Sequence, residues 1–250
     1  MAGWKAYSEL AWVESVVAPP VEFKEETLFF CEMIKQNSQV EVKTLLHLAS
    51  GSGINDYTFK HHFRVTGVDI SEDMLAIARD LNPEVAYEKG DMRYVKLGEH
   101  FDAVAIPDAI GYMQTFEDLR QAVSNARDHL NPGGVLLVTA LTKEQFQPNN
   151  FAYTGTKGDV EVTVFENNYM PADKATTYEA VMVYLVRRRG NLEIYTDRHV
   201  LGLFEMDVWL NLFKELDLQV TQSRVGRFYD RFILEEGDYP LTIFTCTKPF

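Results

Sequence analysis

The feature that most constrains the fold is a short apolar run that ends in a glycine turn. Residues 45–49 are followed by Ser-Gly-Ser-Gly at 50–53, and an amphipathic stretch then continues to about residue 63. A strand, a tight turn and the start of a helix present backbone N–H groups and the positive end of the helix dipole to a ligand. This pattern predicts a nucleotide-binding turn after the first strand of an α/β fold.

Strands and helices then alternate for about a hundred residues. Further apolar runs predict strands, at residues 65–70, 85–88, 101–106 and 135–140. Ser71 and Thr115 are placed to cap helices between these strands, and Pro83 ends the first of those helices. Another helix is predicted at 22–35, and a turn at 131–134. This alternation predicts a doubly wound parallel sheet with helices on both faces and a ligand crevice at the carboxyl ends of the strands.

After residue 141 the pattern becomes that of antiparallel strands. These are predicted at 159–165, 177–186 and 191–200, before a helix at 206–216 and final strands at 218–223 and 241–247. We therefore expect four parts. The first two are an N-terminal helical cap (1–40) and a nucleotide-binding core (41–141). The others are an antiparallel β insertion that forms an acceptor lobe (142–202) and a last helix with strands that complete the core (203–250).

Composition narrows the partners that such a protein can have. Against 24 Lys plus Arg stand 37 Asp plus Glu, a net charge of −13, and this acidity argues against nucleic acid or an anionic membrane as a partner. No apolar run approaches the roughly 20 residues of a membrane span, and the N-terminus lacks a secretory signal. Two cysteines and scattered histidines predict neither a disulfide framework nor a metal site. We expect a cytoplasmic protein, and the sequence leaves a homodimer open.

The residues after the glycine turn indicate which nucleotide would bind. Asp69 ends the second strand, where a carboxylate is placed to bind two ribose hydroxyls. The dinucleotide pattern G-x-G-x-x-G would have its third glycine at the position of Asp56, whose charge would repel a pyrophosphate. S-adenosylmethionine (SAM) has no phosphate, and it carries a ribose, an adenine, a methionine tail and a sulfonium. A dinucleotide-dependent oxidoreductase is therefore the less favoured alternative.

Several motifs follow successive strand ends. They are Ile-Ser-Glu-Asp-Met-Leu at 70–75, Gly-Asp-Met-Arg at 90–93, Phe-Asp-Ala-Val at 101–104, Pro-Asp-Ala at 107–109 and Leu-Asn-Pro-Gly-Gly at 130–134. With the glycine turn, they make residues 44–141 resemble a class I SAM-dependent methyltransferase. The resemblance implies a Rossmann-like, seven-stranded sheet with an N-terminal helical lid. It also implies transfer of a methyl group from SAM to an N or O atom of a small-molecule acceptor.

The resemblance also implies which residues bind the cofactor. Gly51 and Gly53 would line the methionine part, Asp69 would hold the ribose, and Asp91 with Met92 would frame the adenine. The full set of implied cofactor residues is Ala49, Ser50, Gly51, Gly53, Asp69, Ile70, Met74, Asp91, Met92 and Asp108.

The chain departs from the family at His47, and also at Ala49 and Ser50, where the family often has Gly-Cys. An acid usually stands where this chain has His47. We expect His47 to be a buried histidine bonded to the backbone, and this weakens its assignment as the partner of the methionine ammonium group.

The outer region is similar to a narrower group. The antiparallel insertion with Asp-Arg-His-Val-Leu-Gly-Leu-Phe at 197–204 resembles small-molecule methyltransferases that include sugar N-methyltransferases, and uncharacterised bacterial members. In the sugar enzymes, a histidine proposed as a base stands where this chain has Tyr112, and Tyr7 matches a tyrosine that faces the acceptor. These two are the candidate catalytic residues, although a phenol with a pKa near 10 is a poor base. Candidate substrate-binding residues are Tyr153, Tyr178 and His199.

A third interpretation belongs to another class of protein. A non-catalytic SAM-binding or regulatory module would have the same glycine turn, but no nucleophile would reach the methyl group. The sequence leaves open the identity of the acceptor and the use of a general base.

Overall fold

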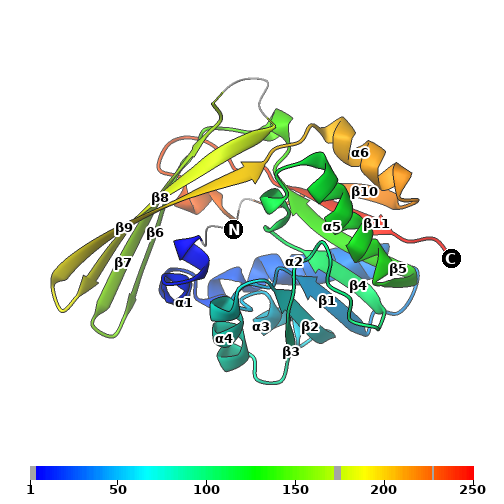
Figure 1. The fold of residues 1–250 in the computed structure, drawn as a ribbon, viewed down its shortest axis with the longest axis horizontal. Coiled ribbons are helices and arrows are strands. Elements are labelled where there is room, and N and C mark those ends of the chain that lie inside the picture. Colours follow the sequence, from blue (N-terminus) through cyan, green and yellow to red (C-terminus); the bar gives the residue numbers. More distant parts are fainter. Residues whose placement is uncertain (1–3, 172–175, 227) are drawn as a thin grey trace.

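The computed structural model describes residues 4–171, 176–226 and 228–250, and Figure 1 shows its two sheets. The larger sheet has seven strands in the order β10-β11-β5-β4-β1-β2-β3, and β11 alone runs antiparallel to its neighbours. Its strands are β1 (Thr44–Leu48), β2 (Arg64–Asp69), β3 (Ala86–Lys89), β4 (Phe101–Ile106), β5 (Leu130–Ala140), β10 (Gln219–Arg224) and β11 (Thr242–Thr247). This confirms the predicted α/β, Rossmann-like sheet.

Helices cover both faces of this sheet, as the alternating pattern predicted. Neighbouring residues of β1 face opposite ways: Leu45 packs with the first group of helices and Leu46 with the second, and both are fully buried. The first group is α2 (Lys24–Asn37), α3 (Asp56–Phe59) and α4 (Glu72–Leu81). The second group is α5 (Phe116–Asp128) and α6 (Met206–Glu215).

Two predicted helix caps are confirmed, and one predicted turn is corrected. The hydroxyl of Ser71 accepts from the Met74 N–H at 3.2 Å, and that of Thr115 accepts from the Asp118 N–H at 3.1 Å. The turn expected at 131–134 instead lies within β5, which begins at Leu130 and pairs there with β4 across a register shift. An alternating or apolar pattern cannot reveal such an irregularity, because the polar residues of the shift read as a turn.

The smaller sheet has four antiparallel strands and extends to the left in Figure 1. It consists of β6 (Asn150–Lys157), β7 (Val160–Tyr169), β8 (Thr177–Arg188) and β9 (Asn191–Gly202). The last three correspond to predicted strands, whereas β6 was not predicted. Its residues combine a glycine with polar side chains, and only Phe151 among them is buried, so the strand carries a weak hydrophobic pattern.

The N-terminal segment packs between the two sheets. It forms η1 (Lys5–Tyr7), α1 (Ala11–Val17) and η2 (Pro20–Phe23), and shorter helical turns elsewhere are η3 (Ile110–Tyr112), η4 (Lys143–Gln145) and η5 (Asp230–Phe232). Val13 and Val16 of α1 pack with apolar side chains of β7 and β8. A β-carbon at Gly155 of β6 would lie 2.0 Å from the Val16 carbonyl oxygen, so only glycine permits this close approach. The segment is called the lid below.

Candidate functional site

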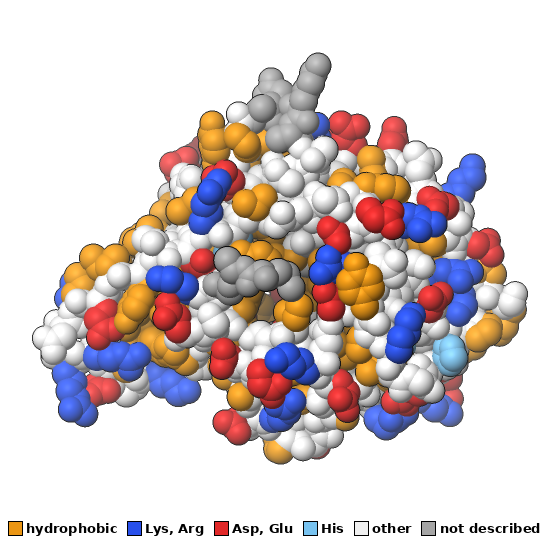
Figure 2. All heavy atoms as spheres, in the orientation of Figure 1, with side chains coloured by type: hydrophobic (Ala, Val, Ile, Leu, Met, Phe, Trp, Pro, Cys, Tyr) orange, Lys and Arg blue, Asp and Glu red, His pale blue; other side chains and the backbone are white. Residues whose placement is uncertain are grey.

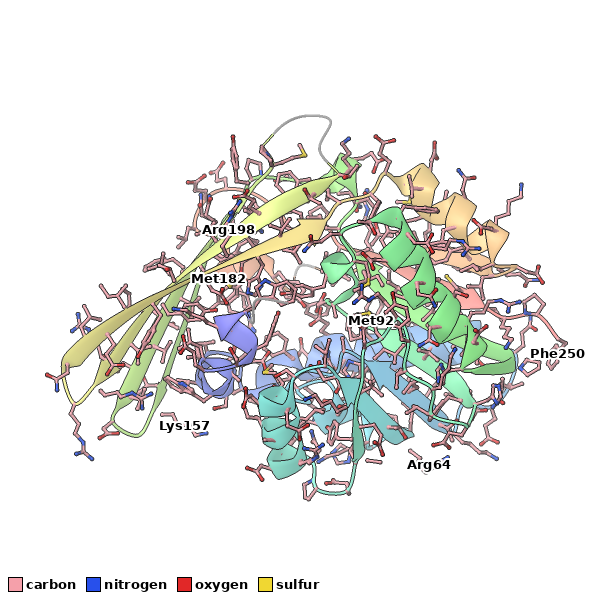
Figure 3. All side chains as sticks on the ribbon, in the orientation of Figure 1. Arg64, Met92, Lys157, Met182, Arg198 and Phe250 are labelled. Carbon is pink, nitrogen blue, oxygen red and sulfur yellow. The ribbon has the colours of Figure 1, made fainter. Side chains whose placement is uncertain are left out.

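A groove of about 880 Å³ crosses the carboxyl ends of β1, β2, β3 and β4. Figure 2 shows a hollow near the centre of this face, with hydrophobic side chains around it, and in Figure 3 the labelled Met92 lies near the middle of the molecule. Nine of the ten residues expected to bind the cofactor line the groove: Ala49, Ser50, Gly51, Asp69, Ile70, Met74, Asp91, Met92 and Asp108. Gly53 does not line it, because the space beside its Cα is occupied by Tyr87 and Asn82.

The carboxylate of Asp69 is held in place by the backbone of two turns. Its Oδ2 accepts from the Gly51 N–H and its Oδ1 from the Ser71 N–H, both at 2.8 Å. Burial raises the pKa of Asp69, and these two backbone donors oppose that rise. The turns therefore orient a carboxylate whose remaining lone pairs can accept from two hydroxyl groups of a ribose.

A buried network lies behind the glycine turn. The imidazole Nδ1 of His47 is 2.7 Å from Asp56 Oδ1, the Tyr87 hydroxyl donates to Asp56 Oδ2, and Asn82 donates to the Gly53 carbonyl. The prediction that His47 bonds the backbone is therefore wrong, because its partner is the carboxylate of Asp56. Asp56 is fully buried and lies outside the groove, so it braces the turn and does not face the ligand as the sequence argument assumed.

At the far end of the groove, Asp91 is fixed by an arginine. Arg93 donates from Nε and from a terminal nitrogen to the Asp91 carboxylate, and its other terminal nitrogen bonds Asp118. Burial opposes ionisation of Asp91, but the hydrogen bonds from Arg93 lower its pKa below the ordinary value. The loop after β3 is held rigid beside the groove, where the adenine was expected.

The lid covers the groove from above. Trp4, Tyr7 and Ser8 line it from the lid, and the Ser71 hydroxyl donates to the Tyr7 carbonyl oxygen at 2.5 Å. Glu14 of α1 also lines the groove, although no sequence motif pointed to it. In the sequence, the one indication of this position is that an acidic residue interrupts an otherwise apolar helix.

A second cavity, of about 310 Å³, lies beside the groove and beneath the smaller sheet. Four residues line both spaces: Tyr7, Phe23, Asp108 and Tyr112. They mark the junction across which a group could pass from a ligand in the groove to one in the cavity. The three candidate substrate-binding residues, Tyr153, Tyr178 and His199, all line this cavity.

The two candidate catalytic tyrosines belong to a continuous chain of hydrogen bonds. The hydroxyls of Tyr7 and Tyr112 are 2.5 Å apart, the Tyr112 hydroxyl is 2.8 Å from Nδ1 of His199, and Nε2 of that ring is 3.1 Å from Asp197 Oδ2. The Ala6 N–H also donates to this oxygen at 2.8 Å. Because the Asp197 carboxylate accepts, the His199 ring donates from Nε2 and accepts from Tyr112 at Nδ1.

Burial sets the protonation states along this chain. It raises the pKa of Tyr7 and of Tyr112 well above that of a free phenol, so both are neutral near pH 7. Burial also lowers the pKa of His199 below its ordinary value, although Asp197 opposes the change. A neutral imidazole, whose acceptor nitrogen is bonded to Tyr112, thus lies behind two neutral phenols.

The carboxyl groups of Asp108 and Glu166 line the cavity, and that of Glu26 lies behind Tyr229. Asp108 accepts from Thr139 and from Tyr229, and the Tyr229 hydroxyl also lies 3.2 Å from Oε2 of Glu26. Burial raises the pKa of Asp108, and burial with the charge of Asp108 raises that of Glu26 to about 9. Glu166 accepts from the Tyr153 hydroxyl at 3.3 Å, and burial raises its pKa to about 6. The cavity therefore combines carboxyl groups with aromatic rings, which suits a cationic ligand.

Neither a metal centre nor a membrane span is found among the described residues. Within residues 4–171, 176–226 and 228–250, no three side chains of His, Cys, Asp or Glu form a group that could hold a metal ion. In the same part of the chain, no helix is both long enough and apolar enough to cross a bilayer.

Comparison with known proteins adds independent findings. A family model described as a methyltransferase domain matches residues 45–134. Over 192 residues the chain is 38% identical to dTDP-3-amino-3,4,6-trideoxy-alpha-D-glucopyranose N,N-dimethyltransferase from Streptomyces venezuelae. The match covers 74% of this chain and 79% of that relative.

Solved structures share the fold over nearly the whole chain. DesVI from Streptomyces venezuelae matches with a TM-score of 0.78 and 24% identity, over 97% of this chain and 96% of that one. SAM-bound CalS10, an amino pentose methyltransferase from Micromonospora echinaspora, matches with a TM-score of 0.74 and 23% identity, over 90% and 91% of the two chains. The likeness extends beyond the seven-stranded sheet, because nine-tenths or more of each chain is covered.

Proposed function

This chain belongs to the SAM-dependent methyltransferases, and we propose that it transfers the methyl group to the nitrogen of a small amine of the amino-sugar class. The junction between groove and cavity carries the proposal, because four residues border both spaces. The named relatives, which act on amino sugars, support this choice of acceptor. The acids and aromatic rings of the cavity support it too, since they suit an ammonium group.

The residues of the groove fit SAM. Asp69 offers acceptors for the ribose hydroxyls, and the apolar side chain of Ile70, 47% exposed, is open to the flat face of an adenine. Ser50 lines the groove, and its buried hydroxyl oxygen has no hydrogen-bond partner within the described residues. When bound, SAM supplies an electrophilic methyl group on a sulfonium.

The cavity residues bind and orient the acceptor. An ammonium group is attracted by carboxylates such as Glu166 and by aromatic rings such as that of Tyr153. Displacement at a sulfonium is an in-line reaction, so holding the nitrogen at the junction supplies most of the acceleration. Residues of the lid and of the smaller sheet line the cavity, and their closure over a bound acceptor would exclude water from it.

The hydrogen-bonded chain provides a path for a proton. An amine that is protonated in water must lose one proton before its lone pair can attack. The ammonium group donates this proton to the Tyr7 oxygen, Tyr7 passes its own to Tyr112, and Tyr112 passes its own to Nδ1 of His199. Both phenols end neutral, and the new imidazolium is stabilised by Asp197. The nitrogen, now with a free lone pair, forms the N–C bond as the S–C bond breaks.

A transfer assay with an acceptor panel tests this proposal. Purified protein is incubated with methyl-labelled SAM and with amino sugars, both free and nucleotide-linked, each paired with the sugar that has a hydroxyl in place of the amine. We expect label in the amino compounds and one S-adenosylhomocysteine formed per methyl transferred. Label in the hydroxyl sugars alone would contradict nitrogen as the acceptor atom.

Calorimetric titration with SAM, with NAD as the control, separates the remaining alternatives. We expect heat with SAM and none with NAD. Binding of SAM without transfer to any compound of the panel would instead favour the non-catalytic module and overturn the proposed reaction.

A further inference from the structure

The lid places in the cofactor groove a carboxylate without a cationic partner. Glu14 lies on α1, whose Val13 and Val16 pack against the smaller sheet, and its side chain reaches the groove beside Ser52. Its Oε2 is buried and has no hydrogen-bond partner within the described residues. The interactions that act on Glu14 come from the side chain and backbone of Ser52 and from the negative charge of Asp69.

Such a carboxylate is costly unless a cation joins it. Burial raises the pKa of Glu14, and the nearby charge of Asp69 raises it further. The carboxylates at the strand ends of the groove differ in this respect, and Asp108 accepts from Thr139 and from Tyr229. Asp69 accepts from two backbone N–H groups, and Asp91 accepts from the guanidinium of Arg93. Glu14 is thus the groove carboxylate that a cationic ligand would stabilise most.

The first strand of the core has no carboxylate that could bind a cationic ligand in place of Glu14. His47 stands there, and its Nδ1 bonds the buried Asp56. SAM carries two positive charges: the sulfonium, which has no hydrogen to donate, and the α-ammonium group, which has three. We propose that Glu14 binds the α-ammonium group of the cofactor, so that the lid and not the core recognises the amino-acid end of SAM. The proposal rests on the SAM groove alone and holds for any acceptor.

This assignment makes lid closure depend on one chemical group of the ligand. A ligand with the ammonium group joins α1 to the glycine turn through Glu14 and Ser52. A ligand that lacks only this group leaves Glu14 buried and unpaired, and closure then costs free energy. S-adenosylhomocysteine and its deaminated analogue differ in this group alone, which makes them the appropriate pair of probes.

Calorimetric titration of the full chain with both probes tests the proposal. For Glu14→Gln, we expect S-adenosylhomocysteine to bind about 10- to 100-fold more weakly, since a hydrogen bond between charged groups contributes on the order of 1.5–3 kcal/mol. The deaminated analogue should bind the variant at least as tightly as it binds the original chain, because glutamine removes the cost of an unpaired carboxylate. This retained affinity also shows that the variant is folded.

The control is Glu9→Gln, on the same lid. Glu9 is exposed and pairs with Lys5, so both affinities should stay unchanged. An equal loss for both probes in Glu14→Gln would overturn the proposal and leave Glu14 a support for the lid. Unchanged affinity for S-adenosylhomocysteine would overturn it as well. Neither outcome affects the proposed amine acceptor, which the transfer assay tests separately.

Discussion

The cofactor groove and the acceptor cavity lie side by side but are built in different ways. The groove takes its floor from consecutive strand ends between residues 47 and 118, whereas the cavity collects side chains from Ala6 to Leu241. In the groove, backbone N–H groups orient Asp69. In the cavity, side chains bond other side chains, such as Tyr229 with Asp108. Local chain geometry therefore determines the first site, and long-range packing determines the second.

The two sites also differ in their electrostatics. Asp91 in the groove is neutralised by Arg93. Glu166 at the cavity bonds Tyr153, and burial raises the pKa of its carboxyl group to about 6. The strand-end carboxylates of the groove therefore meet a ligand with hydrogen-bond donors already in place. The cavity instead holds unfavourable charge that a cationic ligand would relieve.

The largest effect should come from Asp69→Ala, which affects the groove alone. The variant loses a charged acceptor for two ribose hydroxyls, each worth on the order of 2 kcal/mol, so the Kd for SAM should rise about 1,000-fold. Calorimetry measures this, with Asp80→Ala as the control because Asp80 is exposed on the neighbouring α4. Unchanged affinity for SAM would remove the cofactor assignment.

A smaller effect is expected from Tyr112→Phe, which breaks the proton path at the junction of the two sites. We expect kcat to fall about 100-fold, as for the loss of a proton-transfer group, while the Kd for SAM stays the same. In the original chain, kcat should rise as pH increases through the lowered pKa of His199, since the ring accepts a proton only when neutral.

That pH dependence should disappear in the Tyr112→Phe variant. The control is Tyr184→Phe, a buried tyrosine of β8 whose hydroxyl donates to the Met182 sulfur; the labelled Met182 lies on the smaller sheet in Figure 3. A pH–rate profile unchanged by Tyr112→Phe would contradict the proposed path.

The smallest effect should come from Glu166→Gln, which affects the cavity alone. We expect the KM for the amine to rise about tenfold, through loss of one charged hydrogen bond. Burial raises the pKa of Glu166 from 4.5 to about 6, so its ionised form destabilises the fold at pH 7 by up to about 2 kcal/mol. The variant should therefore be more stable at pH 7.

The sign of the pH effect follows from the raised pKa. In the original chain, Glu166 contributes a gain in stability as pH falls from 7 through 6 towards 4.5, and the variant lacks this contribution. Urea denaturation at pH 7 and pH 5 measures the difference. Glu161→Gln, on an exposed position of the same β7, should change neither stability nor KM. Lower stability of Glu166→Gln at pH 7 would show that the carboxylate has a supporting role instead.

The comparison also explains what the sequence could predict. Strand ends and caps such as Ser71 depend on neighbouring residues, so the fold and nearly all of the groove followed from local patterns. The inward orientation of Asp56 did not follow from local patterns, because it depends on a hydrogen bond from Tyr87 on a distant strand. Glu14 could not be assigned either, since an acid in a short lid helix acquires its meaning only when the helix packs over the glycine turn.

The hydroxyl of Ser71 connects the position of the lid with the proposed proton path. It caps α4 and also donates to the carbonyl of Tyr7, the residue that begins the proton path. If the lid opens to admit or release the cofactor, the bond from Ser71 breaks and Tyr7 separates from Tyr112. The proposed path to His199 is then interrupted, so proton transfer along it would require the closed lid.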